Sequence, residues 1–185
     1  MTANLNLPLK SLLVLGGARS GKSRYAQKLA EASNRLPVLI ATAQAHDDEM
    51  AQRIARHVAA RDARWRVVEE PAAVAAALLR EAGPERLLVV DCATLWLSNL
   101  LLSGDDLEAA SKELAQIVGR LAGPVVFVSN EVGLGIVPDN ALARRFRDAQ
   151  GWLNQALAAA CDGVVLVSAG LARRIKPAPE PDIQF

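Results

Sequence analysis

Short apolar runs separated by helical patterns constrain the fold of this chain more than any other feature. The runs are rich in valine and leucine and mostly lack apolar–polar alternation, which is typical of strands covered on both faces. They occupy residues 11–15, 37–42, 65–69 (half polar), 87–91, 124–129 and 163–168. Helical patterns lie between nearly all of them, at residues 22–33, 47–63, 72–82, 105–121 and 140–160. The sequence therefore predicts a three-layer α/β fold with right-handed crossovers and a mostly parallel central sheet.

The length of 185 residues fits a single domain over residues 1–185, because a domain contains roughly 150 residues. We expect flexible ends at residues 1–10 and at the proline-rich residues 177–185, which can continue neither a helix nor a central strand. The chain has 21 basic and 20 acidic residues and a net charge of +1. This balance argues against a nucleic-acid binder, whose affinity comes from uncompensated basic residues.

The sequence shows no signal for a membrane or for secretion. No apolar run approaches the ~20 residues needed to cross a bilayer. The first residues, MTANLNLPLK, lack the basic start and apolar run of a secretory signal. Cys92 and Cys161 lie in apolar surroundings far apart in the sequence, which is typical of buried thiols rather than of a disulfide framework. These features predict a cytoplasmic protein with no membrane span.

The most specific motif follows the first apolar run and opens the first helical pattern. It matches G-x-x-x-x-G-K-[ST] with Gly16, Gly17, Ala18, Arg19, Ser20, Gly21, Lys22 and Ser23. Glycines allow successive backbone N–H groups to surround phosphate oxygens, and a helix N-terminus adds positive potential. In such a loop Lys22 contacts the outer phosphates and the Ser23 hydroxyl binds Mg²⁺. The motif predicts a nucleotide-binding site and a fold like that of P-loop NTPases.

A phosphate loop of this kind needs an acidic partner at the end of another strand. Asp91 follows four apolar residues at the end of the run 87–91. We expect its carboxylate to bind Mg²⁺ or part of the nucleotide. The alternative is that Asp91 caps the N-terminus of a helix that starts near Thr94.

The helical pattern after the second apolar run carries Arg53, His57 and Arg61 at a spacing of four, hence on one face. The arginines disfavour protonation of the imidazole, and a neutral imidazole can act as a nucleophile. Their guanidinium groups also suit phosphate oxygens. The alternative for His57 is a solvated or structural histidine. We interpret His46 as a loop or helix-start residue.

These segments together resemble one family along residues 12–176. The stretch DDEM at residues 47–50 and the stretch NEVGLGIVP at residues 130–138 are the most specific parts of the resemblance. The family is the bifunctional adenosylcobinamide kinase / adenosylcobinamide-phosphate guanylyltransferase of cobalamin biosynthesis. The resemblance implies that a nucleoside triphosphate phosphorylates the aminopropanol hydroxyl of adenosylcobinamide. GTP then transfers GMP to that phosphate, giving adenosylcobinamide-GDP and pyrophosphate.

The resemblance also implies site residues and partners. His57 would carry GMP covalently, because R-I-x-x-H-x-x-x-R matches residues 53–61. Further nucleotide contacts would be Thr42, Ala43, Gln44, Val58, Ala59, Ala60, Arg61, Glu69 and Asp91. Mg²⁺ would be the cofactor, on Ser23 and Asp91. ATP and GTP, adenosylcobinamide and its phosphate would be substrates, and the chain would form a homo-oligomer.

Two further segments leave alternatives open. Asn130 and Glu131 follow an apolar run and predict a loop that faces nucleotide or corrinoid, the alternative being a turn into the next helix. The apolar residues 95–102 suit either the core or a subunit contact.

On the residues alone, two other function classes compete with the bifunctional enzyme. A single-activity P-loop kinase for a small metabolite would share the phosphate loop and Asp91 but has no use for His57. A nucleotide-binding switch would need a partner surface that responds to the γ-phosphate, and the sequence contains no recognisable switch motif.

Overall fold

The computed structural model describes residues 9–45, 48, 52 and 61–177. Within them, seven strands form one sheet in the order β3-β2-β4-β5-β1-β6-β7. Their bounds are β1 Ser11–Gly16, β2 Leu36–Ala41, β3 Arg66–Glu69, β4 Arg86–Asp91, β5 Val125–Asn130, β6 Gly163–Ser168 and β7 Leu171–Lys176. All neighbouring strands are parallel except β6 and β7, which are antiparallel. The mostly parallel sheet and all six predicted strands are confirmed.

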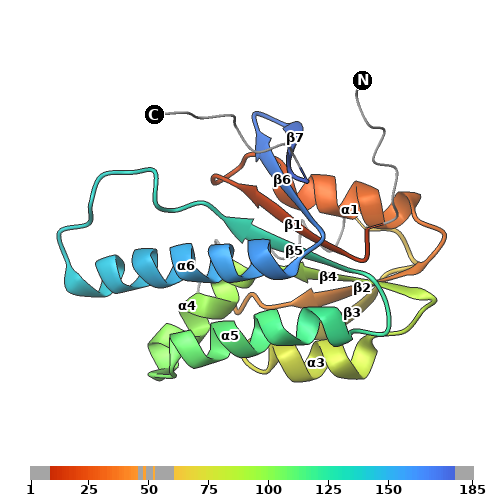
Figure 1. Cartoon of the computed structure of the whole chain (residues 1–185), viewed down its shortest axis with the longest axis horizontal. Coiled ribbons are helices and arrows are strands. Elements are labelled where there is room, and N and C mark those ends of the chain that lie inside the picture. The colour runs from red at the N-terminus through yellow and green to blue at the C-terminus, as the bar shows by residue number, and fades with distance from the viewer. Residues whose placement is uncertain (1–8, 46–47, 49–51, 53–60, 178–185) are drawn as a thin grey trace, which may run out of the picture.

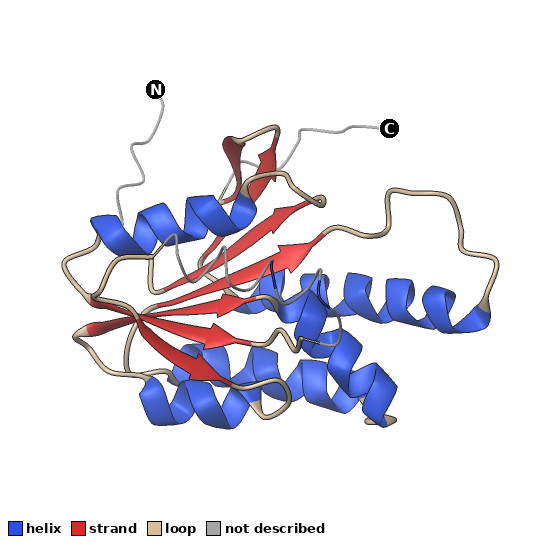
Figure 2. Ribbon diagram, turned by 180° about the vertical axis from the view of Figure 1, so that it is seen from behind, coloured by secondary structure: helices blue, strands red, loops and turns tan. Residues whose placement is uncertain are grey.

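The described helices lie on both sides of this sheet (Figure 1). They are α1 Lys22–Ala32, α3 Val74–Glu81, α4 Ala93–Ser103, α5 Leu107–Ile117 with the 3₁₀ turn η1 Val118–Arg120, and α6 Ala141–Ala160. Helix α1 covers one face and helices α3 to α6 cover the other, as Figure 2 shows from behind. The predicted three layers are therefore present. The helix predicted at residues 47–63 falls mostly outside the described residues.

The alternation of side chains in β5 defines the two faces of the sheet. Val126 and Val128 pack in the apolar cluster that contains Ala26 and Ala30 of α1. Phe127, which is fully buried, packs in the cluster on the side of α3 to α6. Successive residues of a strand point to opposite faces, so this assignment fixes the direction of every side chain in β5.

Trp96 settles the question about the apolar segment 95–102. The Trp96 side chain is 3% exposed, and its indole N–H donates a hydrogen bond of 2.7 Å to the carbonyl of Ala72. Leu97, Leu100 and Leu101 are buried in the same cluster. This segment belongs to the core of the chain itself, except for Leu102, which is 70% exposed.

Strand β7 is the strand of the described sheet that the sequence patterns missed, and helix α4 also lies outside the predicted helical patterns. The residues of β7 are mostly exposed at the edge of the sheet and include Arg173, Arg174 and Lys176. An exposed edge strand buries no apolar face, so it leaves no apolar run in the sequence. None of the described helices is long and apolar enough to cross a membrane.

Candidate nucleotide-binding site

The phosphate loop joins the carboxyl end of β1 to the first turn of α1. Gly21 stands at the N-cap of α1 with φ of 97°, and no side chain caps this helix end. Arg19 also adopts a positive φ, of 56°. Because no side chain occupies the helix end, the backbone N–H groups of its first turn remain suited to an anion.

Close packing explains the glycine at the start of this loop. A Cβ atom on Gly16 would lie 2.5 Å from the carbonyl oxygen of Val167 and 2.5 Å from the Ser20 hydroxyl. The backbone N–H of Gly170, in the turn between β6 and β7, donates a hydrogen bond of 2.8 Å to the carbonyl of Ser20. The β6–β7 hairpin therefore supports the phosphate loop from the side, a contact that the sequence patterns did not reveal.

Lys22 is buried within the loop. The residue is only 7% exposed, and its Nζ donates a hydrogen bond of 3.0 Å to the carbonyl of Gly17. The ammonium group is thereby held close to the loop backbone, where it adds a full positive charge to the partial charges of the N–H groups.

Ser23 and Asp91 meet between β1 and β4. The Ser23 hydroxyl donates a hydrogen bond of 3.2 Å to Oδ1 of Asp91. The alternative that Asp91 caps a helix is wrong, because Cys92 is the N-cap of α4 and its Sγ accepts from the N–H of Leu95 at 3.4 Å. A hydroxyl and a carboxylate oxygen at this distance are ligands that suit Mg²⁺ together with phosphate and water oxygens.

Three strands end in line at the same edge. Ala41 of β2 pairs with Glu69 of β3 on one side and with Asp91 of β4 on the other. Thr42 follows directly and is buried, and its hydroxyl donates to the carbonyl of Cys92 at 2.8 Å and accepts from the N–H of Cys92 at 2.9 Å. The Thr42 hydroxyl therefore ties the end of β2 to that of β4.

The remaining predicted contacts of this edge differ in exposure. Ala43 is half-buried, whereas Gln44 and Glu69 are exposed. Both exposed side chains thus lie at the carboxyl edge of the sheet and are open to solvent.

Arg61 is electrostatically coupled to this edge. Its guanidinium carbon lies 5.7 Å from the centroid of the Trp65 ring. Burial lowers the pKa of Arg61, and the negative charge of Asp91 partly opposes that shift. The positions of His57, Val58, Ala59 and Ala60 lie outside the described residues, as does His46.

A buried polar network supports the end of β5. The Ser129 hydroxyl donates to Oδ1 of Asn154 at 2.7 Å and accepts from Nε2 of Gln150 at 2.9 Å. The next residue, Asn130, donates its backbone N–H to the Thr94 hydroxyl at 2.7 Å. The network joins α4, β5 and α6 beside the phosphate loop. Of its residues, only Asn130 was indicated by the sequence, because it follows an apolar run.

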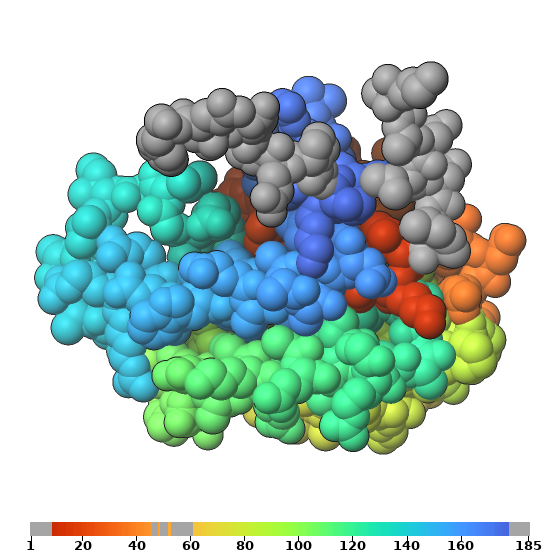
Figure 3. Space-filling model, viewed as in Figure 1, coloured from red at the N-terminus to blue at the C-terminus, as the bar shows by residue number. Residues whose placement is uncertain are grey.

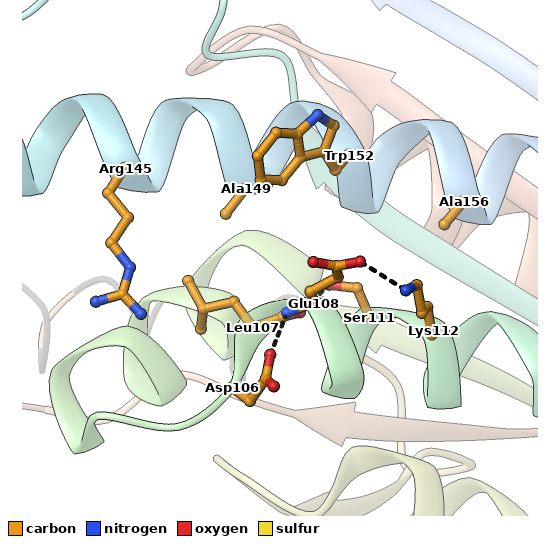
Figure 4. A pocket seen from close by; sticks show the side chains of 9 residues that line it. All are labelled: Asp106, Leu107, Glu108, Ser111, Lys112, Arg145, Ala149, Trp152 and Ala156. Atoms are coloured by element: carbon orange, nitrogen blue, oxygen red, sulfur yellow. Dashed lines mark hydrogen bonds and ion pairs between the residues drawn. The ribbon is translucent and has the colours of Figure 1, made fainter.

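A cavity of about 430 Å³ lies elsewhere, between α5 and α6 (Figure 4). Trp152 and Arg145 line it from α6, and the ion pair of Glu108 and Lys112, 2.6 Å long, lines it from α5. None of the predicted nucleotide contacts that the structure describes lines this cavity, so it is separate from the phosphate loop.

Solved structures with a similar fold include a secretion ATPase and a recombinase. The assembled ATPase EscN of the enteropathogenic E. coli type III secretion system matches with a TM-score of 0.60 and 13% identity, over 87% of this chain and 43% of that one. The RadB recombinase matches with a TM-score of 0.52 and 15% identity, over 84% of this chain and 73% of that one. At these identities the likeness supports the fold alone, and it confirms the predicted P-loop NTPase-like architecture.

Similarity in sequence is much more specific. The bifunctional adenosylcobalamin biosynthesis protein CobP of Pseudomonas aeruginosa is 52% identical over 169 residues, which cover 90% of this chain and 98% of that protein. The corresponding CobU proteins of Salmonella typhimurium and Escherichia coli are 42% and 40% identical, each over 89% of this chain and 99% of the relative. Residues 12–175 match the family described as cobinamide kinase / cobinamide phosphate guanyltransferase. This chain therefore belongs to the cobinamide kinase / cobinamide phosphate guanyltransferase family.

Proposed function

We propose that this chain phosphorylates the aminopropanol hydroxyl of adenosylcobinamide with a nucleoside triphosphate. It then transfers GMP from GTP to the new phosphate, through a guanylylated His57, and releases pyrophosphate. The observation that carries the proposal is the contact of Ser23 with Asp91 beside the phosphate loop, in a chain of this family. That contact brings the nucleotide motif and the strand-end acid into one site, as phosphoryl and nucleotidyl transfer both require.

In the kinase reaction, the loop amides and Lys22 hold the triphosphate. Ser23 and Asp91 are the residues that would bind Mg²⁺, which neutralises charge on the phosphate oxygens when bound. Lys22 is already buried and directed along the loop, so little reorganisation precedes transfer. The alcohol oxygen forms the new P–O bond and the nucleoside diphosphate leaves.

In the guanylyltransferase reaction, His57 attacks the α-phosphorus of GTP and forms a phosphoramidate while pyrophosphate leaves. Arg61 stabilises the charge that develops, because a guanidinium group suits phosphate oxygens. The covalent intermediate divides a transfer between two bulky substrates into two steps with one substrate in each. Further proposed nucleotide contacts are Thr42, Ala43, Gln44, Val58, Ala59, Ala60 and Glu69.

The decisive experiment measures the intact protein mass after incubation with GTP and Mg²⁺, followed by peptide mapping. We expect a GMP adduct on the peptide that contains His57. His57→Ala should abolish the adduct and leave kinase activity, whereas the matched control His46→Ala should retain both. Lys22→Ala should impair both reactions, because both depend on triphosphate binding.

The second candidate is the single-activity kinase, which the same phosphate loop would serve. Folded protein that binds GTP but acquires no adduct would favour it. The preference of the kinase reaction for ATP or GTP is measured separately, as the rate of adenosylcobinamide phosphorylation with each donor.

We also propose a homo-oligomer that works in the cytoplasm. Exposed apolar side chains on the loop between β5 and α6 support the oligomer: Leu134 is 88%, Ile136 97% and Val137 61% exposed. This loop stands out from the body in the space-filling view (Figure 3).

The free, buried thiols of Cys92 and Cys161 suit a reducing compartment such as the cytoplasm. Sedimentation equilibrium tests the oligomer, and a monomer at micromolar concentration would contradict it.

A further inference from the structure

Asn130 ends the strand that separates the two halves of the phosphate site. Strand β5 lies between β4, which ends at Asp91, and β1, which leads into the phosphate loop. Asn130 pairs with Gly16, whereas Asp91 pairs with Val128. Asn130 therefore extends two residues beyond Asp91 along the edge, directly between the loop and the strand-end acid.

The side chain of Asn130 is directed to the face that carries the phosphate loop. Ser129 joins the polar network on the side of α4 and α6, so the alternation of the strand turns Asn130 to the opposite face, that of α1 and Ser23. The backbone is held on both sides: its N–H donates to the Thr94 hydroxyl, and its carbonyl accepts from Nδ2 of Asn154 at 3.0 Å.

The next residue, Glu131, attaches the end of β5 to the start of the phosphate loop. The backbone N–H of Glu131 donates a hydrogen bond of 3.1 Å to the carbonyl of Gly16. The Asn130 carboxamide is thus carried by a backbone that three other elements hold in place, which is how a group that positions a substrate is expected to be supported.

Oδ1 of Asn130 is buried and has no hydrogen-bond partner among the residues that the structure describes. A buried acceptor without a partner is costly to stability, and such groups are kept where a ligand supplies the missing donor. Phosphate oxygens are themselves acceptors and cannot satisfy it. In the orientation that the carboxamide has in this structure, the partner of Oδ1 must therefore carry an O–H or N–H group.

We propose that Oδ1 of Asn130 accepts a hydrogen bond from the hydroxyl of the phosphoryl acceptor and aligns its oxygen with the terminal phosphorus. This inference rests on the proposed kinase reaction. The hydroxyl oxygen forms the new P–O bond, and the bond to the bridging β-phosphate oxygen breaks. The nucleoside diphosphate leaves with that electron pair, and the hydroxyl proton passes to the phosphoryl oxygens and then to water. The amide itself takes up no proton.

The test compares Asn130→Ala with the matched control Asn140→Ala. Asn140 is an exposed residue whose Oδ1 caps α6 by accepting from the N–H of Ala143 at 2.8 Å. Steady-state kinase kinetics with adenosylcobinamide and ATP or GTP, thermal unfolding and formation of the GMP adduct are measured for both variants.

We expect Asn130→Ala to lower kcat of the kinase reaction by roughly 100-fold, since misalignment of a reacting oxygen costs about that much. Its KM for the nucleotide and its GMP adduct should be unchanged, because neither involves the acceptor hydroxyl. Its Tm should stay the same or rise, because an unpaired acceptor is removed. Asn140→Ala should lower Tm and leave kcat unchanged.

Three results would overturn the inference. The first is an unchanged kcat for Asn130→Ala while the wild type is active. The second is a Tm lowered as in Asn140→Ala, which would assign a structural role. The third is a raised requirement for Mg²⁺ or nucleotide, which would assign the hydrogen bond to a metal-bound water instead. Inactivity of the wild type toward adenosylcobinamide would overturn the proposed function itself, and the inference with it.

Discussion

The hydroxyl of Ser23 donates a hydrogen bond of 3.2 Å to Oδ1 of Asp91, across 68 positions of the sequence. We propose that these two oxygens bind Mg²⁺. We expect Asp91→Asn to raise the Mg²⁺ concentration needed for half-maximal kinase activity by about 10–100-fold, because an amide is a weaker ligand than a carboxylate. Mg²⁺ titration of initial rates measures the effect.

The control for that substitution is Asp106→Asn. Asp106 caps α5 through Oδ1, and asparagine accepts the same backbone N–H groups. This variant should keep the Mg²⁺ dependence of the wild type. An identical Mg²⁺ requirement in Asp91→Asn would remove Asp91 from the metal site.

Trp65 holds the guanidinium of Arg61 near its ring face. Trp65→Leu removes an interaction of about 0.5–1 kcal/mol, which corresponds to roughly a 2- to 5-fold rise in the KM for GTP if Arg61 contacts the nucleotide. Trp65→Phe keeps an aromatic face and should show a smaller rise. Equal KM values for the leucine, phenylalanine and wild-type proteins would separate Trp65 from nucleotide binding.

The hydrogen bond from Gly170 to Ser20 links the β6–β7 turn to the phosphate loop. Gly170 has φ of 81° and Gly104, at the end of α4, has φ of 82°. Alanine at either position should cost about 1–2 kcal/mol, because a side chain is strained in this conformation. Chemical denaturation should therefore show similar losses for Gly170→Ala and Gly104→Ala.

Only Gly170→Ala should also weaken nucleotide binding, since relief of the strain shifts the turn that supports the loop. Isothermal titration with GTP distinguishes the two variants. A Kd for Gly170→Ala that equals that of Gly104→Ala would mean that the loop holds its shape without the hairpin.

Glu81 is a buried carboxylate that accepts hydrogen bonds from Arg66 and Arg86. These bonds, chiefly that from Arg66, lower the pKa of Glu81 below its ordinary value of 4.5. A carboxylate whose pKa is lower in the folded than in the unfolded protein contributes its full stabilisation at pH values above the unfolded-state pKa. That contribution is lost as the pH falls through the folded-state pKa. Glu81→Gln should therefore be less stable by about 1–2 kcal/mol at pH 7, and the difference should narrow below pH 4.5.

Glu108→Gln provides the matched control for Glu81→Gln. Glu108 pairs with Lys112 on an exposed helix face, where solvent screens an ion pair and it adds little to stability. Urea unfolding at several pH values compares the two variants. A constant difference between Glu81→Gln and wild type down to low pH would contradict the assignment.

Local patterns were sufficient for much of the architecture. Strand β1, the phosphate loop and α1 are contiguous, so the order of apolar run, glycines and helix was readable directly. Likewise, Asp91 could be placed at a strand end because four buried residues precede it. Helix α5 begins at Leu107 rather than at residue 105, because the side chain of Asp106 caps it. Such boundaries depend on side-chain hydrogen bonds that periodicity does not reveal.

The sequence by itself determined the strands of the buried sheet, the phosphate loop and the residue types that carry phosphate chemistry, because each is specified by neighbours in the chain. Only the tertiary structure decided the strand order that brings Ser23 to Asp91, the hairpin that supports Ser20 through Gly170, and the direction and unpaired oxygen of Asn130. These relationships join residues that are distant in the chain, and they arise from the packing of helices on both faces of a twisted sheet, which no local pattern encodes.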